Sequence, residues 1–149
     1  MKKTEQLKLS NQVCFPIYSV SRLLTKAYKP YLDKMEITYP QYLVLMVLWE
    51  EEGITVNQIS EKLLLNTNTV SPLLKRMEKS ELINRNRSNE DERSVIIQLT
   101  KKGKLLKKQA AHIPENLLKV LFTDKVELSD IVHLKETLDE LIIALSPKD

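Results

Sequence analysis

Residues 54–100 constrain the fold of this chain more than any other stretch. The segment Asn66–Ser80 has the periodicity of an amphipathic α-helix, with apolar side chains on one face and polar side chains on the other. The apolar face comprises Val70, Leu73, Leu74 and Met77. The opposite face carries amides, hydroxyls and cations, with Asn68, Ser71, Pro72, Lys75 and Lys79 facing outwards and Arg76 on the flank. Because this outer face has no acidic side chain, it suits contact with a polyanion.

A shorter helix is predicted just before it, over residues 56–64. Thr55 and Gln58 have the spacing of a capping box, which marks the start of a helix. Only Leu65 and Asn66 separate the two predicted helices, so the chain must turn sharply between them. A short apolar helix, a tight turn and a polar-faced second helix form the helix-turn-helix pattern of DNA-binding proteins.

A charged hairpin is predicted after the second helix. Residues 82–87 and 95–99 alternate in the manner of β-strands, and the seven residues between them read SNEDERS. A polar helix followed by a basic hairpin predicts a winged helix, with the helix in the major groove of DNA and the wing in the minor groove. The predicted fold class is mainly α with a small β-hairpin.

Long helices are predicted on both sides of this segment. The first runs from about Ser10 to Ala27, is broken or kinked at Lys29–Pro30, and adds a last turn over Tyr31–Met35. Thr38 and Gln41 form a second capping box, which opens a buried helix that reaches Glu52. Thr100 is predicted to cap a helix that reaches Phe122 with a kink at Pro114, and a last helix covers Ser129–Leu145.

The net charge of +3 is unevenly distributed. Residues 75–108 hold 11 basic and 5 acidic side chains, whereas residues 109–149 hold 4 basic and 8 acidic ones. The positive excess therefore coincides with the recognition helix, the wing and the start of the following helix. A charge run alone is usually a solvated face, but its coincidence with a helix-turn-helix favours a nucleic-acid surface.

Several classes of protein are disfavoured by the sequence. No apolar run approaches the length of a membrane span, and the first residues, MKKTEQLKLSNQ, have no apolar signal core, so a cytoplasmic protein without membrane contact is expected. One cysteine excludes an internal disulfide. We find no phosphate-binding loop, nucleophile motif or cluster of metal ligands, so we expect no enzyme activity, cofactor or metal. The two histidines lack ligand-spaced partners.

The terminal helices carry more apolar surface than a small winged helix needs. The first interpretation is a homodimer interface formed by about residues 1–35 and 101–149, with the winged-helix region between them at about 36–100, in one domain of 149 residues. The alternative is that these helices pack on their own domain. A dimer is favoured because a two-fold DNA site needs a two-fold protein.

Three segments resemble the MarR family of bacterial transcription regulators: DERSVIIQLTKKG (91–103), TVSPLLKRME (69–78) and YPQYLVLMVLWE (39–50). The resemblance covers nearly the whole chain and implies a winged-helix repressor that dimerises through its terminal helices. Its partner would be double-stranded DNA with a pseudo-palindromic operator. We predict base contacts from Thr67, Asn68, Thr69 and Ser71, and phosphate contacts from Lys75, Arg76 and Lys79. On the wing, the candidates are Arg87, Arg93 in the minor groove, and Asp91 bracing the hairpin as in the family.

The lone cysteine, Cys14, falls in the first turn or two of the first helix, where exposed N–H groups favour a thiolate. Its surroundings, QVCFPIYSVS, and the segments KAYKPYLDK and ITYPQYLVLMVLWE are similar to the organic-hydroperoxide-sensing (OhrR-like) branch of the family. The resemblance implies that Cys14 is the sensor and that Tyr28 and Tyr39 hydrogen-bond its thiolate across the dimer. Peroxide would give a sulfenic acid, resolved by a low-molecular-weight thiol or another protomer, or else overoxidised.

Two other functions stay open at this stage. Cys14 can be a small buried apolar residue in a repressor that is released by a small phenolic ligand. A thiol-dependent peroxidase is disfavoured, because the sequence shows no base or cation near the cysteine.

Three positions depart from the family pattern. Pro16 follows the cysteine closely and Asn68 stands where the sensor branch often has Gly. Glu81 replaces a common helix-ending Gly, so a left-handed turn there would cost about 1 kcal/mol.

Overall fold

The computed structural model describes residues 3–148, and they form two compact units that divide between Ala111 and His112. Each unit is described by itself. The first begins with two short 3-10 helices, η1 (Lys3–Leu7) and η2 (Leu9–Asn11), ahead of the long helix α1 (Cys14–Lys34). It continues with α2 (Tyr39–Glu50), β1 (Ile54–Thr55), α3 (Val56–Leu63), α4 (Thr67–Lys79), β2 (Ile83–Arg87), β3 (Val95–Leu99) and α5 (Lys101–Ala110). The second unit contains α6 (Ile113–Leu121) and α7 (Leu128–Leu145).

The core of the first unit is built around α2 and α4, as the apolar patterns predict. Buried side chains from α2 are Tyr42, Val44, Leu45 and Leu48, and those from α4 are Val70, Leu73, Leu74 and Met77. The predicted apolar face of the recognition helix is therefore confirmed in full. Its burial leaves the opposite, polar face of α4 on the surface.

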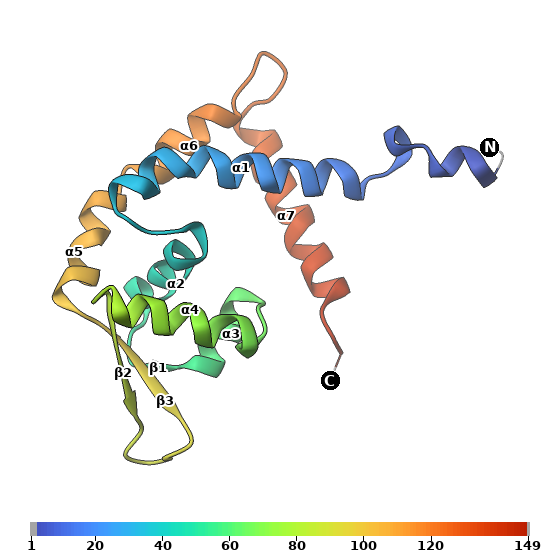
Figure 1. Cartoon of the computed structure of the whole chain (residues 1–149). Helices are drawn as coiled ribbons and strands as arrows, with labels where there is room; N and C mark the ends of the chain where they lie inside the picture. Colours follow the sequence, from blue (N-terminus) through green and yellow to red (C-terminus); the bar gives the residue numbers. More distant parts are fainter. Residues whose placement is uncertain (1–2, 149) are drawn as a thin grey trace. The chain divides into compact units, whose positions relative to one another are not determined.

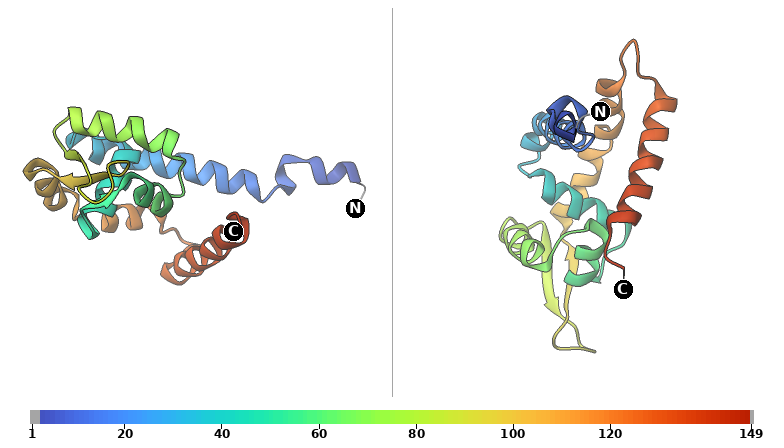
Figure 2. Two further views of the ribbon diagram at one scale, coloured as in Figure 1. Left: turned by 90° about the horizontal axis from the view of Figure 1, so that it is seen from below. Right: turned by 90° about the vertical axis from the view of Figure 1, so that its right-hand side faces the viewer.

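The hairpin is confirmed, and the structure adds a third strand. The sheet is antiparallel with strand order β1-β3-β2, and Ile97 pairs with Ile54 on one side and Arg85 on the other. The two-residue β1 is too short to give an alternation signal in the sequence. The tip of the β2–β3 hairpin projects past the helices of the first unit, as the wing of a winged helix does (Figures 1 and 2).

Local capping signals predicted the helix starts well. Thr38 with Gln41 and Thr55 with Gln58 form complete capping boxes, and Thr100 accepts the Gly103 N–H at 3.1 Å. Asn66 caps α4 by accepting the N–H of Asn68 at 2.8 Å. These caps depend on side chains within a few residues, which is why the sequence alone reveals them.

The prediction at Lys29–Pro30 is a break or a kink, and the break is wrong, because α1 runs through Pro30 to Lys34. Proline removes one backbone hydrogen bond, but Lys29 bridges the site by an ion pair with Asp33 at 2.7 Å. Beyond the proline, Leu32 is buried in the core and holds the last turns in place. The helix also begins at Cys14 rather than Ser10, since residues 9–11 form η2.

Pro114 has a different role from the predicted kink. The helix predicted up to Phe122 is two helices, α5 ending at Ala110 and α6 beginning at Ile113. Pro114 occupies the first turn of α6, where a missing N–H has no helical partner to lose. The last helix follows the prediction closely, beginning at Leu128 and ending at Leu145.

The turn after α4 is tied to the start of α5. Glu81 has a φ of 61°, so it adopts the left-handed conformation that was expected to cost a residue other than glycine about 1 kcal/mol. The Thr100 hydroxyl donates to the Glu81 carbonyl at 2.6 Å, and the Lys102 ammonium donates to the Ser80 carbonyl at 2.9 Å. A Cβ on Gly103 would lie 2.3 Å from the Leu82 carbonyl oxygen, so only glycine permits this approach. The end of the recognition helix is thereby fixed against α5.

The second unit is two amphipathic helices joined by a loop that closes with a bridge between Thr123 and Val126. Within residues 128–145, which make up α7, no side chain is buried. Its exposed apolar residues are Leu128, Val132, Leu134, Leu141, Ile142, Ile143 and Leu145. Among residues 3–148, no helix is both long and apolar enough to cross a membrane.

Candidate nucleic-acid interface and thiol site

The turn between α3 and α4 sets the direction of the recognition helix. Leu64 ends α3 in the left-handed conformation with a φ of 55°, and the Leu65 N–H donates to the Ser60 carbonyl at 3.0 Å. The next residue, Asn66, already caps α4. With both helices anchored by buried side chains, this turn leaves the first residues of α4 exposed.

The structure brings the predicted base-contacting and phosphate-contacting residues onto the exposed side of α4. Thr67, Asn68 and Thr69 are exposed in the first turn, and Ser71 is half-buried. The cations Lys75, Arg76 and Lys79 are exposed further along the same helix. Glu78 is exposed beside them, so the prediction that this outer face carries no acid is wrong. Within residues 3–148 none of these three cations forms an ion pair. Their charge is therefore available to a polyanion.

Asp91 organises the tip of the wing. One carboxylate oxygen accepts the backbone N–H of Arg93 at 3.0 Å, and the other accepts the Ser94 hydroxyl at 3.1 Å. The predicted bracing residue thus acts on the backbone of Arg93 and leaves the guanidinium exposed. Arg87 is also exposed, at the tip end of β2. The Ser88 hydroxyl also accepts the backbone N–H of Glu90, at 3.2 Å. The wing therefore presents two arginines on a hairpin whose turn is held by side-chain caps.

A contact between the recognition helix and the wing has no counterpart in the sequence prediction. Glu78, near the end of α4, accepts the backbone N–H of Arg85 on β2 at 3.2 Å, and its other oxygen lies 3.8 Å from the Arg85 guanidinium. Glu78 lies on a helix and Arg85 on a strand, so no periodicity within one element relates them. No signal in the sequence could have paired them.

Cys14 is the first residue of α1, and its side chain is exposed. Tyr28 lies fourteen positions further along the same helix, so their Cα atoms are about 21 Å apart at the α-helical rise of about 1.5 Å per residue. A Cys14 thiol therefore cannot meet Tyr28 of its own chain. Contact between the two requires a second protomer.

The structure does bring the two predicted tyrosines together. The ring centroids of Tyr28 and Tyr39 are 4.9 Å apart, and both rings contact Tyr42, at 5.7 and 6.3 Å. Burial raises the pKa of all three phenols above the usual 10.0, and neighbouring phenols raise the pKa of Tyr28 further. A raised pKa keeps each phenol protonated at neutral pH, so the cluster offers uncharged O–H donors.

Tyr42 is the member of this cluster that the sequence analysis missed. It was assigned only to the apolar helix α2, and its contacts with Tyr28 depend on how α1 packs. Tyr42 also contacts Trp49 edge-on at 6.2 Å, and the Trp49 indole N–H donates to the Gly103 carbonyl at 2.9 Å. The ring cluster is thus connected through packed side chains to the N-terminal end of α5.

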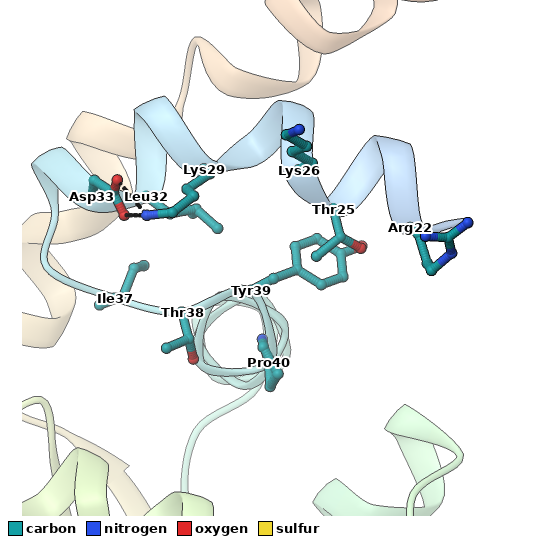
Figure 3. Close-up of a pocket in the computed structure, with 10 residues that line it drawn as sticks. All are labelled: Arg22, Thr25, Lys26, Lys29, Leu32, Asp33, Ile37, Thr38, Tyr39 and Pro40. Carbon is teal, nitrogen blue, oxygen red and sulfur yellow. Dashed lines mark hydrogen bonds and ion pairs between the residues drawn. The ribbon is translucent and has the colours of Figure 1, made fainter. Parts of the chain in front are cut away.

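A pocket of about 490 Å³ adjoins Tyr39, between α1 and the start of α2 (Figure 3). In this view the Tyr39 ring extends from α2 towards Thr25, and Lys29 is paired with Asp33. The pocket is lined by Arg22, Thr25, Lys26, Lys29, Leu32, Asp33, Ile37, Thr38, Tyr39 and Pro40. Its volume lies within the usual range for small-molecule sites, about 300–1,000 Å³.

Apolar side chains remain exposed along α1 near the cysteine: Val13, Phe15, Ile17, Tyr18, Val20 and Leu23. Monomeric proteins seldom expose an apolar surface this extended. Among residues 3–148 there is no group of three or more metal-ligating side chains. The exposed surface around Cys14 thus has the character of a protein contact.

The comparisons with known proteins agree with these features. Residues 26–110 match the family model for transcriptional regulators of the SarA/Rot type. The chain is 49% identical to the organic hydroperoxide resistance transcriptional regulator of Bacillus subtilis, over 99% of this chain and 98% of the relative.

Solved structures of AbfR, a protein of Staphylococcus epidermidis, are also similar. The reduced protein bound to DNA has a TM-score of 0.78 and 36% identity, covering 97% of this chain and 98% of that one. The overoxidised protein bound to DNA has a TM-score of 0.69 and 40% identity, covering 94% and 99%. The chain therefore belongs to the SarA/Rot family of transcriptional regulators, a MarR-type winged-helix family of DNA-binding proteins.

Proposed function

We propose that the chain is a homodimeric repressor that binds a pseudo-palindromic operator and is released when an organic hydroperoxide oxidises Cys14. The observation that carries this proposal is that the chain has both an exposed cysteine at the start of α1 and a cluster of neutral phenols. The two lie too far apart to meet within one chain, so the phenols of a partner would have to reach the cysteine. The relative from Bacillus subtilis, named for organic hydroperoxide resistance, supports the same function. The site of action would be the cytoplasm, where operator DNA lies.

On DNA, the two recognition helices of the dimer would enter successive major grooves about 34–36 Å apart. Thr67, Asn68, Thr69 and Ser71 would face base edges, whereas Lys75, Arg76 and Lys79 would hold phosphates. Arg93 would enter the minor groove next to the recognition helix, with Arg87 nearer the backbone. This assignment is supported by their exposure on α4 and the wing.

Arg93→Ala is expected to weaken operator binding by about tenfold, because it removes a minor-groove cation without touching the core. Affinity of the wild type should fall steeply with salt, with a log–log slope of about −0.9 for each neutralised phosphate. Fluorescence anisotropy with labelled operator at several salt concentrations measures both. Lys34→Ala, an exposed cation at the end of α1, is the matched control and should bind like the wild type. Unchanged affinity in Arg93→Ala, or a salt-independent complex, would remove the wing from the interface.

The redox step would begin with attack of the Cys14 thiolate on the terminal oxygen of the hydroperoxide. The O–O bond breaks, the sulfur becomes a sulfenic acid, and the alkoxide leaves and takes up a proton to give the alcohol. A low-molecular-weight thiol would then condense with the sulfenic acid to a mixed disulfide, releasing water. Without such a thiol, further peroxide would overoxidise the sulfur. Tyr28 and Tyr39 of the partner would hydrogen-bond the thiolate before the reaction and lose that contact after it.

Tyr28→Phe and Tyr39→Phe are expected to respond to hydroperoxide several-fold more slowly than the wild type. Each variant removes one O–H donor, worth about 1 kcal/mol or more towards a charged sulfur, and leaves the ring packing intact. Stopped-flow measurement of sulfenic acid formation gives the rate. Lys34→Ala, which removes an exposed cation at the end of the same helix, should react at the wild-type rate. Equal rates in all four proteins would show that the phenols take no part.

The pocket beside Tyr39 supports a second candidate function, a repressor released by a small phenolic ligand. Its floor includes the buried Leu32 and Ile37, which suit an aromatic ring. Its rim holds three cations and one carboxylate, which suits an acidic phenol such as salicylate. In this case Cys14 would be structural, and the protein would respond to the ligand with or without the thiol.

A further inference from the structure

The position of β2 in the sheet leaves backbone groups without a strand partner. With strand order β1-β3-β2, β2 is an edge strand, and its outward N–H groups face away from β3. Unpaired edge groups need another acceptor or water. For Arg85, that acceptor is the Glu78 carboxylate of α4, at 3.2 Å. One side chain of the recognition helix therefore satisfies an outward N–H group on the edge of the wing.

The Arg85 side chain also contacts Glu78, which gives a second link between the wing and the recognition helix. Its guanidinium lies 3.8 Å from Glu78, and about a fifth of the side chain is exposed. The Arg85 Nε is buried and has no hydrogen-bond partner among residues 3–148. This nitrogen is therefore not drawn towards another acceptor in the described chain. The bond to the backbone N–H is the shorter contact, and because the ion pair is long and partly exposed it adds less.

The position of Glu78 is unfavourable for DNA binding if charge alone is considered. It lies on the same helix as Lys75, Arg76 and Lys79, and its side chain is exposed by 44%. A carboxylate beside phosphate-binding cations repels a polyanion. Its contribution to a DNA-binding surface must then be geometric.

We propose that Glu78 is a positioning residue, which fixes the wing relative to the recognition helix so that both grooves of DNA are engaged at once. The root of the wing is already held by the buried Leu82 and Ile83. The Glu78–Arg85 contact lies two residues closer to the tip and restricts the hairpin there. The proposal rests on the proposed role of Arg93, because a fixed wing matters only if its tip contacts DNA.

Glu78→Ala is expected to lower operator affinity by about fivefold to tenfold, the equivalent of one partly exposed charge-assisted hydrogen bond. Simple electrostatics gives the opposite sign, because removing an acid should strengthen attraction to DNA. Glu92→Ala is the matched control: it removes an exposed wing acid whose side chain makes no hydrogen bond or ion pair among residues 3–148, and it should bind as well as the wild type or better. Glu78→Gln keeps an acceptor oxygen for the Arg85 N–H and should retain most of the affinity.

A double-mutant cycle with Arg93→Ala separates positioning from any general effect. In the Glu78→Ala background, Arg93→Ala should cost less affinity than in the wild type, because the wing is already misplaced. Additive losses would overturn the proposal, as would an affinity of Glu78→Ala equal to or above that of Glu92→Ala. Equal losses in Glu78→Gln and Glu78→Ala would also overturn it. If Arg93→Ala alone has no effect, the proposed wing contact fails and the role of Glu78 fails with it. If Arg93→Ala weakens binding and Glu78→Ala does not, only the role of Glu78 fails.

Discussion

Cys14→Ser is expected to stay bound to its operator under an organic hydroperoxide and a small thiol that release the wild type. Serine keeps the size and polarity of the side chain, but its hydroxyl is not oxidised by peroxide. In the absence of oxidant, the affinities of the two proteins should agree, since Cys14 is far from the exposed face of α4 in the sequence and belongs to another helix. With oxidant, the wild type should lose about tenfold or more in affinity, corresponding to about 1.4 kcal/mol.

The physical reason is the change at sulfur. A thiolate accepts hydrogen bonds from the neutral phenols, whereas a sulfenic acid or mixed disulfide has lost the charge and occupies more space. The ring cluster connects through Tyr42 and Trp49 to Gly103, and Gly103 lies against the turn that ends α4. A displacement at the phenols thus has a packed route to the recognition helix, and a shift of a few ångströms would spoil the fit to two half-sites.

Operator binding by anisotropy, with mass spectrometry of the same samples, tests this result. Release should accompany one modified sulfur per chain. If Cys14→Ser leaves DNA as readily as the wild type under peroxide, Cys14 is not the sensor. If neither protein responds to peroxide and salicylate releases both, the pocket beside Tyr39 is the regulatory site.

Replacing Leu134 and Leu141 together by Gln is expected to abolish the dimer and, with it, high-affinity binding to a full operator. Both side chains are exposed on α7, at 48% and 42%. They belong to a row of apolar residues on that helix, none of which is buried. Because these side chains are already about half buried, covering each one is worth about 0.7–1.5 kcal/mol, and the apolar rows together can supply a stable interface. A dimer that binds two half-sites gains about a hundredfold or more over a monomer that binds one.

Sedimentation at micromolar concentration should give the wild type twice the chain mass of 17.3 kDa and the variant one such mass or aggregates. Glu140→Gln is the matched control, because it places the same amide next to Leu141 on the polar side of α7. It should remain a dimer. The same effect, in stronger form, is expected on removal of residues 129–149. A wild-type monomer that still binds a full operator tightly would contradict the dimer.

Local patterns gave the most accurate predictions. The capping boxes at Thr38 and Thr55 and the apolar row of α4 depend on residues within one or two helical turns, so their energetics are already set by neighbours in the sequence. Two expectations about proline, the break that was one alternative at Lys29–Pro30 and the kink at Pro114, were wrong for the same reason. Whether Pro30 ends a helix and whether Pro114 kinks one or starts one depends on the burial of later turns, such as Leu32, and not on proline itself.

In the candidate site, too, the local features could be predicted from the sequence and the contacts between elements could not. The sequence by itself determined which side chains are exposed on the recognition helix, because the apolar face of an amphipathic helix dictates its polar face. It also placed the lone cysteine in the first turn or two of a helix, and the structure made Cys14 the first helical residue. Only the tertiary structure decided that Tyr28 and Tyr39 form one cluster with Tyr42, and that Glu78 reaches Arg85. These contacts join residues on different elements, and their distances depend on how helices and strands pack, which no periodicity within a single element records.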